Sequence, residues 1–168
     1  MVKKKIFFIS NKCWNFINFR KELIQNFSNN NLYDVYIISK KDQYVSEIEQ
    51  MNIKFIHWSI SANSINPFVE IKSIFHLLLI FYKYKPDIIF SFTAKANIYC
   101  SLIRKLKSFY FCPNITGLGS YYINNSLFKY IYFLFYKYFF KNSNFIFVQN
   151  KNDRNLFIEK YNFDKKKN

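Results

Sequence analysis

Polar side chains follow four of the apolar runs in this sequence, each where a strand is expected to end. The set combines hydroxyls, amides, glycines and two cations: Ser10, Asn11 and Arg20; Thr93, Lys95 and Asn97; Thr116, Gly117 and Gly119; Gln149 and Asn150. Together with helix N-termini, such groups suit sugar hydroxyls and a phosphate group. Any one of them is better explained as an ordinary helix cap, as for Thr93 or Asn152. Their convergence on one edge of a sheet favours a ligand site.

The stretch Asn114–Tyr122 carries both glycines of the chain, Gly117 and Gly119. Glycine reaches positive φ at little cost and lets a ligand approach the backbone closely. Because the stretch follows the apolar run Phe109–Cys112, it predicts a loop at the edge where open α/β sheets bind ligands. A tight turn without a ligand explains the glycines equally well. The pair is not a dinucleotide fingerprint, which would need glycine at Tyr122 and would follow the first strand.

Other kinds of active site find little support in the residue spacing. His57 is expected at a strand end and His76 on an apolar helix face, so packing is favoured over catalysis for both. Neither histidine forms a metal-ligand spacing with the other or with a cysteine, and we expect no metal site. No arrangement of serine, histidine and acid supports a catalytic triad. The three scattered cysteines, Cys13, Cys100 and Cys112, fit a reducing cytoplasm without a disulfide framework.

The elements that must position these residues alternate between strands and helices. Strands are expected at Ile6–Ser10, Val35–Ser39, Ile53–His57, Pro86–Ser91, Phe109–Cys112 and Phe145–Val148. Helices are expected at Phe19–Phe27, Asp42–Met51 (with Asp42 as its cap), Pro67–Tyr84, Lys95–Lys107, Ser126–Lys141 and Asn152–Lys160, with a loop over Asn11–Asn18. Alternation of this kind gives βαβ units with right-handed crossovers. We therefore predict an α/β fold, a Rossmann-like parallel six-stranded sheet with helices on both faces.

Composition says less about partners than the charge suggests. Lys and Arg number 25 against 10 Asp and Glu, a formal net charge of +15, which normally indicates nucleic acid or a membrane surface. Abundant Lys, Asn, Ile, Phe and Tyr also follow from A/T-rich codons, so we discount the charge. The helix expected over Leu127–Phe140 has a lysine edge and apolar residues elsewhere. A core helix that covers the sheet is favoured there over an interfacial helix.

Nearly the whole chain resembles the N-terminal domain of the retaining GT-B glycosyltransferases of family 4. The motifs that carry the resemblance are Asn18–Arg20, Ile65–Phe68, Lys85–Ile89, Phe92–Tyr99, Thr116–Gly119 and Phe147–Asn150. Their order and spacing are fairly specific together, whereas none is specific alone. The likeness is greatest to the branch that extends polyprenyl-diphosphate-linked sugars for capsule, O-antigen or N-linked glycans. That branch includes enzymes that add N-acetylgalactosamine to undecaprenyl-diphosphate-bacillosamine.

The resemblance implies one half of a GT-B enzyme: an acceptor-side domain over residues 1–163, a frayed tail over 164–168, and no C-terminal donor domain. It also implies metal-independent transfer from a nucleotide sugar, without a cofactor, to a polyprenyl-diphosphate-linked acceptor. Such a protein would be cytoplasmic and peripheral to the inner membrane. Thr116 would border the transferred sugar, where many members have a histidine or an acid, and Arg20 and Lys95 would contact acceptor phosphate or sugar. The chain alone is expected to be inactive.

Three other functions stay open at this point. A separate chain would supply the donor domain in a split enzyme. A sugar epimerase with a GT-B-like fold would share the architecture and would also need a second half. A basic protein that binds nucleic acid or anionic lipid is disfavoured by the βαβ order and by the lack of a compact recognition motif.

Overall fold

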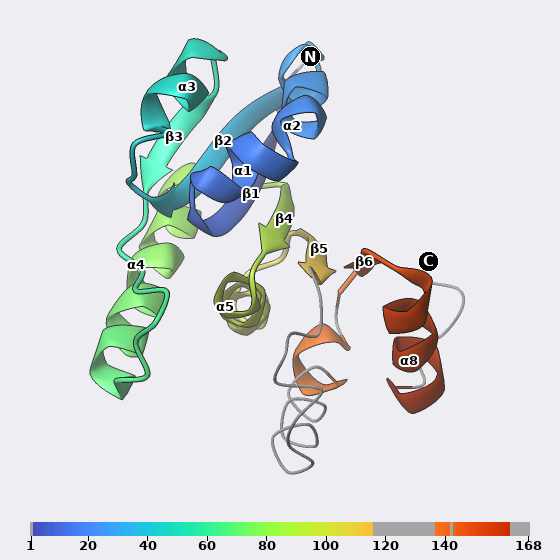
Figure 1. Ribbon diagram of the computed structural model, residues 1–168. Helices are drawn as coiled ribbons and strands as arrows, with labels where there is room; N and C mark the ends of the chain where they lie inside the picture. Colours follow the sequence, from blue (N-terminus) through green and yellow to red (C-terminus); the bar gives the residue numbers. More distant parts are fainter. Residues whose placement is uncertain (1, 116–136, 142, 162–168) are drawn as a thin grey trace.

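The computed structural model describes residues 2–115, 137–141 and 143–161, which form one parallel sheet with helices on both faces (Figure 1). The strands are β1 (Lys4–Lys12), β2 (Tyr33–Lys40), β3 (Lys54–His57), β4 (Ile88–Phe92), β5 (Tyr110–Ile115) and β6 (Phe147–Val148). They lie in the order β3-β2-β1-β4-β5-β6, and each neighbouring pair is parallel. The strand order reverses between β1 and β4, which is where doubly wound sheets open a crevice for ligands. The predicted fold class is confirmed.

Two hydrophobic cores hold the layers together because β1 is buried on both faces. The described helices are α1 (Trp14–Phe19), α2 (Lys21–Ser28), α3 (Val45–Gln50), α4 (Pro67–Tyr84), α5 (Ala94–Arg104) and α8 (Lys151–Tyr161). Phe7 and Ile9 pack with residues of α4 and α5, whereas Ile6 and Phe8 pack with residues of α1, α2 and α3. Successive side chains of a strand point to opposite faces, so one apolar run serves both cores.

The start of the chain differs from the sequence expectation. We expected a loop over Asn11–Asn18, but β1 continues to Lys12 and α1 begins at Trp14. The reason is tertiary: the Asp42 carboxylate accepts the Trp14 backbone N–H at 3.2 Å, and Phe16 is buried. The N-cap position of α3 falls at Tyr44 instead of Asp42, but the Asp42 carboxylate accepts the Tyr44 backbone N–H at 3.0 Å in the turn that leads into the helix.

Helix α4 begins and ends where the local residues require. The Asn66 side chain accepts the Phe68 backbone N–H at 3.0 Å, and Pro67 takes the first helical position, which favours proline. Lys85 ends the helix in the left-handed conformation, with φ 52°, directly before Pro86. The expected bounds of this helix are therefore confirmed. Most of the helix expected over 126–141 lies outside the described residues. Its described part, residues 137–140, is helical.

The two histidines meet beside the middle of α4. The ring centroids of His57, at the end of β3, and His76, on α4, are 6.3 Å apart. Each Nδ1 atom accepts a backbone N–H, His57 from Lys41 at 3.3 Å and His76 from Ser59 at 3.1 Å. Both rings thus order the backbone around them. Within the described ranges, no group of three or more His, Cys, Asp or Glu residues is arranged to hold a metal ion.

This pair predicts a loss of stability in mild acid. Burial and the nearby His57 lower the pKa of His76 below its ordinary value of 6.5. His76 therefore binds a proton more readily in the unfolded chain than in the folded one. Its neutral ring contributes fully to folding stability above pH 6.5, and this contribution is lost as the pH falls through the pKa of the folded state. We expect a lower urea midpoint at about pH 5.5 than at about pH 7.5, and a smaller difference between the two in His76→Asn. An equal fall in both proteins would contradict the prediction.

Candidate functional site

The loops after β1 and β4 meet at the carboxyl edge of the sheet, where a hydrogen bond joins them. The Thr93 hydroxyl donates to Asn11 Oδ1 at 2.9 Å. Thr93 holds the N-cap position of α5 but makes no side-chain cap bond, so the ordinary-cap interpretation does not account for its hydroxyl. Its φ of 112° is costly for a β-branched residue, and such strain concentrates at functional sites.

Beside this bond lies a hollow of about 260 Å³. Its lining comes from three separate parts of the chain: Asn15, Phe19 and Arg20; Phe92 and Thr93; and Gln149. The Arg20 guanidinium carbon lies 5.5 Å from the Phe92 ring centroid, and Nη1 donates to the Phe19 carbonyl at 2.8 Å. In the described part of the chain no carboxylate pairs with Arg20. The hollow therefore offers the guanidinium of Arg20, a hydroxyl, amides and two aromatic rings.

A larger hollow, of about 780 Å³, adjoins the first one. It shares Phe19, Arg20 and Gln149 with it, and it extends along the ends of β5 and β6 past Asn114 and Val148. Arg20 thus stands where the two hollows join. A ligand with a polar head and a longer body would place its charged part beside this guanidinium.

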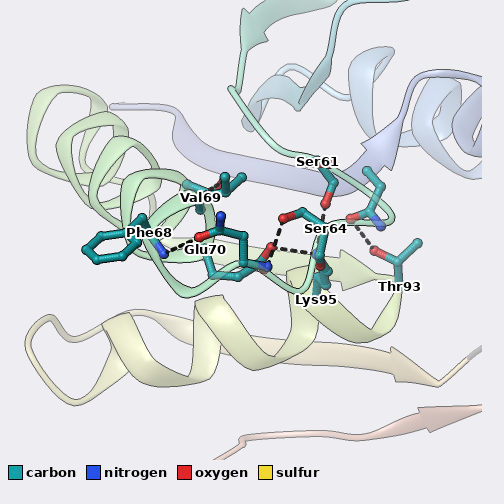
Figure 2. A network of polar contacts seen from close by, with 10 residues as sticks. Ser61, Ser64, Phe68, Val69, Glu70, Thr93 and Lys95 are labelled. Atoms are coloured by element: carbon teal, nitrogen blue, oxygen red, sulfur yellow. Dashed lines mark hydrogen bonds and ion pairs between the residues drawn. The ribbon is translucent and has the colours of Figure 1, made fainter.

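Asn97 and Lys95 are engaged inside the structure. The Asn97 amide is buried, accepts the Ser91 hydroxyl at 2.6 Å and donates to the Asn114 carbonyl at 3.0 Å, so it ties α5 to β4 and β5. Lys95 Nζ reaches the Ser61 and Ser64 carbonyls, at 2.9 and 2.5 Å, and Glu70 Oε1 at 2.8 Å (Figure 2). Lys95 therefore anchors the loop before α4 to α5.

The other expected site residues are placed less fully. Ser10 is buried and accepts the Asn15 amide at 2.7 Å. The Asn150 carbonyl accepts the Arg154 N–H at the start of α8, and Asn152 lies inside that helix instead of at its cap. The catalytic candidate and both glycines, Thr116, Gly117 and Gly119, lie outside the described residues, directly after β5.

A group of lysines at the same edge was missed. A register shift in β1 places Lys12 beside Lys40 of β2, and Lys41 follows. With Trp14 and Asp42, these lysines line a hollow of about 670 Å³. Like charges on neighbouring strands repel, and within the described residues no side chain pairs with these ammonium groups. An anion would relieve that repulsion. The signal in the sequence was a lysine at the end of each of the first two strands.

The cysteines do not supply a nucleophile. Cys13 Sγ lies 2.9 Å from the Ser39 hydroxyl, and burial raises the pKa of Cys13 to about 11. Burial likewise raises the pKa of Cys112 to about 11 and that of Cys100 well above its ordinary value. A thiol must be ionised to react, so all three are inert near neutral pH.

Comparison with known proteins gives one family. Residues 5–150 match the sequence profile described as glycosyl transferase 4-like. The N,N'-diacetylbacillosaminyl-diphospho-undecaprenol alpha-1,3-N-acetylgalactosaminyltransferase of Campylobacter jejuni is 32% identical over 125 residues, which are 71% of this chain and 33% of that protein. The chain thus spans about a third of this curated relative.

Solved structures share the architecture. A glycosyltransferase from Rickettsia africae superposes with a TM-score of 0.70 at 17% identity, over 99% of this chain and 42% of its own. The UDP-GlcNAc 2-epimerase of Methanocaldococcus jannaschii gives 0.66 at 13% identity, over 99% and 44%. Likeness at such low identity shows the fold alone. In the ranges that the structure describes, no helix is both long and apolar enough to cross a bilayer.

The backbone strain at Thr93 predicts an unusual ranking of two variants. Both Thr93→Gly and Thr93→Ala remove the bond to Asn11, but only glycine relieves the positive φ. Thr93→Gly should therefore be more stable than Thr93→Ala by about 1–2 kcal/mol, although glycine ordinarily destabilises relative to alanine. Urea unfolding measures the difference. Equal stability, or a more stable alanine variant, would show that the backbone is unstrained there.

The Lys95 anchor predicts a second stability effect. Lys95→Met leaves the half-buried Glu70 carboxylate unpaired, so we expect a loss of about 3 kcal/mol in the free energy of unfolding. Lys95→Met/Glu70→Leu should recover most of that loss, because it removes both charges. Chemical denaturation of the single and double variants tests this. A double variant as unstable as the single one would mean that the two carbonyl contacts dominate.

Proposed function

Because this chain belongs to the glycosyl transferase 4-like family, we propose that it serves sugar transfer from a nucleotide sugar to a polyprenyl-diphosphate-linked saccharide. Its part in that reaction is to bind the acceptor. The hollow around Arg20 carries this proposal, since it combines a guanidinium with hydrogen-bonding groups at the carboxyl edge of the sheet. The relative from Campylobacter jejuni is named for transfer of a sugar to a diphospho-undecaprenol-linked saccharide, which supports a polyprenyl-diphosphate-linked acceptor for this chain.

In this proposal each chemical group of the acceptor has a counterpart in the hollow. Arg20 would form charge-assisted hydrogen bonds with the diphosphate or with a sugar oxygen. Thr93 and Gln149 would bond sugar hydroxyls, with Asn11 orienting the Thr93 hydroxyl. The rings of Phe19 and Phe92 would pack against the C–H face of a sugar. These contacts would bind and orient the acceptor, which reduces the entropy cost of bringing two substrates together.

The reaction would need a second domain to bind the nucleotide-sugar donor. The described residues that line the smaller hollow include no carboxylate and no imidazole, so in this proposal it positions the acceptor and does not act as a base. Thr116 and the glycines after β5 would border the transferred sugar. The nucleotide sugar would bind a donor domain, supplied either by further sequence in the same protein or by a separate chain. We also propose that the protein works at the cytoplasmic face of a membrane, where a lipid-linked acceptor is presented.

A sugar epimerase is the second candidate. The Methanocaldococcus jannaschii epimerase shares the fold, at 13% identity, whereas the identity of 32% lies with a glycosyltransferase. Epimerisation of a nucleotide sugar would need no lipid-linked acceptor, so acceptor binding separates the two functions.

Binding of a short-chain, water-soluble polyprenyl-diphosphate-linked saccharide tests the proposal. We expect the chain to bind it, and Arg20→Gln to bind it about tenfold more weakly, because one charge-assisted hydrogen bond is lost. Calorimetry or fluorescence titration measures the affinity. Lys4→Gln removes an equal charge at the opposite edge of the sheet and should bind like the unmodified chain. No binding, or equal weakening by both substitutions, would overturn the assignment, as would turnover of a nucleotide sugar by this chain alone.

A further inference from the structure

Helix α4 presents an apolar surface to solvent along its full length. Its five most exposed large apolar residues are Phe68 (77%), Ile71 (62%), Phe75 (57%), Leu79 (49%) and Tyr82 (51%). At 3.6 residues per turn they fall within an arc of about 80° and extend over about 21 Å. We refer to these five residues as the α4 strip. Ile65, just before the helix, is 95% exposed.

The opposite side of α4 is committed to the core. Leu77, Ile80 and Phe81 are buried against the sheet. A helix that is apolar all round is normally covered all round. Taking roughly 200 Å² for an aromatic side chain, the strip exposes on the order of 500 Å², the upper range for the largest apolar patch of a monomer. Such an area indicates that something covers it in use.

Among the described residues, the charged side chains that border the strip are positive. Lys72 and Lys83 border it along one side of the helix and are exposed. Lys107 Nζ lies 4.1 Å from the centroid of the Tyr82 ring. The only acidic residue of α4, Glu70, lies away from the strip and is paired with Lys95. Lysines beside aromatic and aliphatic residues are the pattern of a helix that lies in the surface of an anionic bilayer.

Two other occupants fit the strip less well. In a symmetric dimer through this surface, Lys72 and Lys83 would meet the same lysines of the second copy without an acidic partner. A donor lobe would sit at the carboxyl edge of the sheet. Helix α4 runs from that edge to the opposite one, as the crossover to a parallel strand requires, so Leu79 and Tyr82 lie away from such a lobe. Figure 1 shows α4 at the border of the molecule, extending past the sheet.

We propose that the α4 strip and its lysines dock this protein on an anionic phospholipid membrane, with α4 lying in the plane of the interface. This inference rests on the proposed function, because a lipid-linked acceptor places the enzyme at a membrane. The strip begins at the carboxyl edge of the sheet, where the Arg20 hollow lies. Docking there brings that edge to the depth at which the diphosphate of a membrane-embedded acceptor emerges.

Vesicle co-sedimentation with phosphatidylcholine vesicles, with and without phosphatidylglycerol, tests the proposal. The chain should bind the anionic vesicles, and Phe68→Ser/Phe75→Ser should bind them at least about tenfold more weakly. The affinity of Lys72→Gln/Lys83→Gln for anionic vesicles should fall about fivefold for each lysine removed, with no change on neutral vesicles. The matched control Leu32→Ser/Phe145→Ser removes two exposed apolar side chains elsewhere and should bind normally.

Separate readouts distinguish the possible failures. The strip variant should keep its far-ultraviolet circular dichroism and its affinity for the water-soluble acceptor. Normal vesicle binding by that variant, or no vesicle binding by the unmodified chain, would overturn the docking proposal even where acceptor binding stands. Failure of the unmodified chain to bind the water-soluble acceptor would overturn the proposed function, whereas the vesicle results alone decide the docking proposal. A dimer that dissociates in Phe68→Ser/Phe75→Ser would show that a second copy covers the strip.

Discussion

Burial of the central strands on both faces is the constraint from which the rest of this structure follows. Five consecutive residues of β1 and five of β2 are fully or nearly fully buried. Polar groups can then enter the sheet only near strand ends, where a neighbouring element satisfies them. Ser10, Ser39 and Ser91 are fully buried there, and each is hydrogen-bonded to the next part of the chain. The carboxyl edge is therefore both the polar edge and the edge that fixes the loops.

That constraint explains how much of the fold follows from the sequence. Apolar runs of four to six residues between helical patterns identify buried parallel strands, and right-handed βαβ crossovers explain the helices. The reversal of strand order between β1 and β4 comes from the structure and was not predicted. Helix α1 escaped detection because its N-terminus depends on Asp42, 28 residues away in the sequence. Local patterns carry no information about such a partner. The same limit applies to the register shift that places Lys12 beside Lys40.

The candidate site was predictable as a location but not as a list of contacts. Strand-end positions correctly indicated Asn11, Thr93 and Gln149 at one edge. Residue type alone cannot separate a side chain that faces a hollow from one that braces it. Asn97 turned inward because the ends of β4 and β5 offered a hydroxyl and a carbonyl, and Lys95 because two carbonyls and a carboxylate lay within reach. The direction of such an amide or ammonium group depends on the hydrogen-bond partners that folding brings near it.

Helix α4 links the site to the surface of the molecule. Asn66 fixes where the helix starts, and the contact between Lys95 and Glu70 fixes that start against α5, the helix that follows Thr93. In Figure 2 the Phe68 ring points away from this ion pair, so one turn of helix carries an inward anchor and the first outward residue of the strip. A periodic sequence pattern shows only that α4 is apolar; which half stays uncovered depends on this anchor. The contact between Lys95 and Glu70 therefore ties the start of the strip to the helix that follows Thr93, a residue that lines the Arg20 hollow.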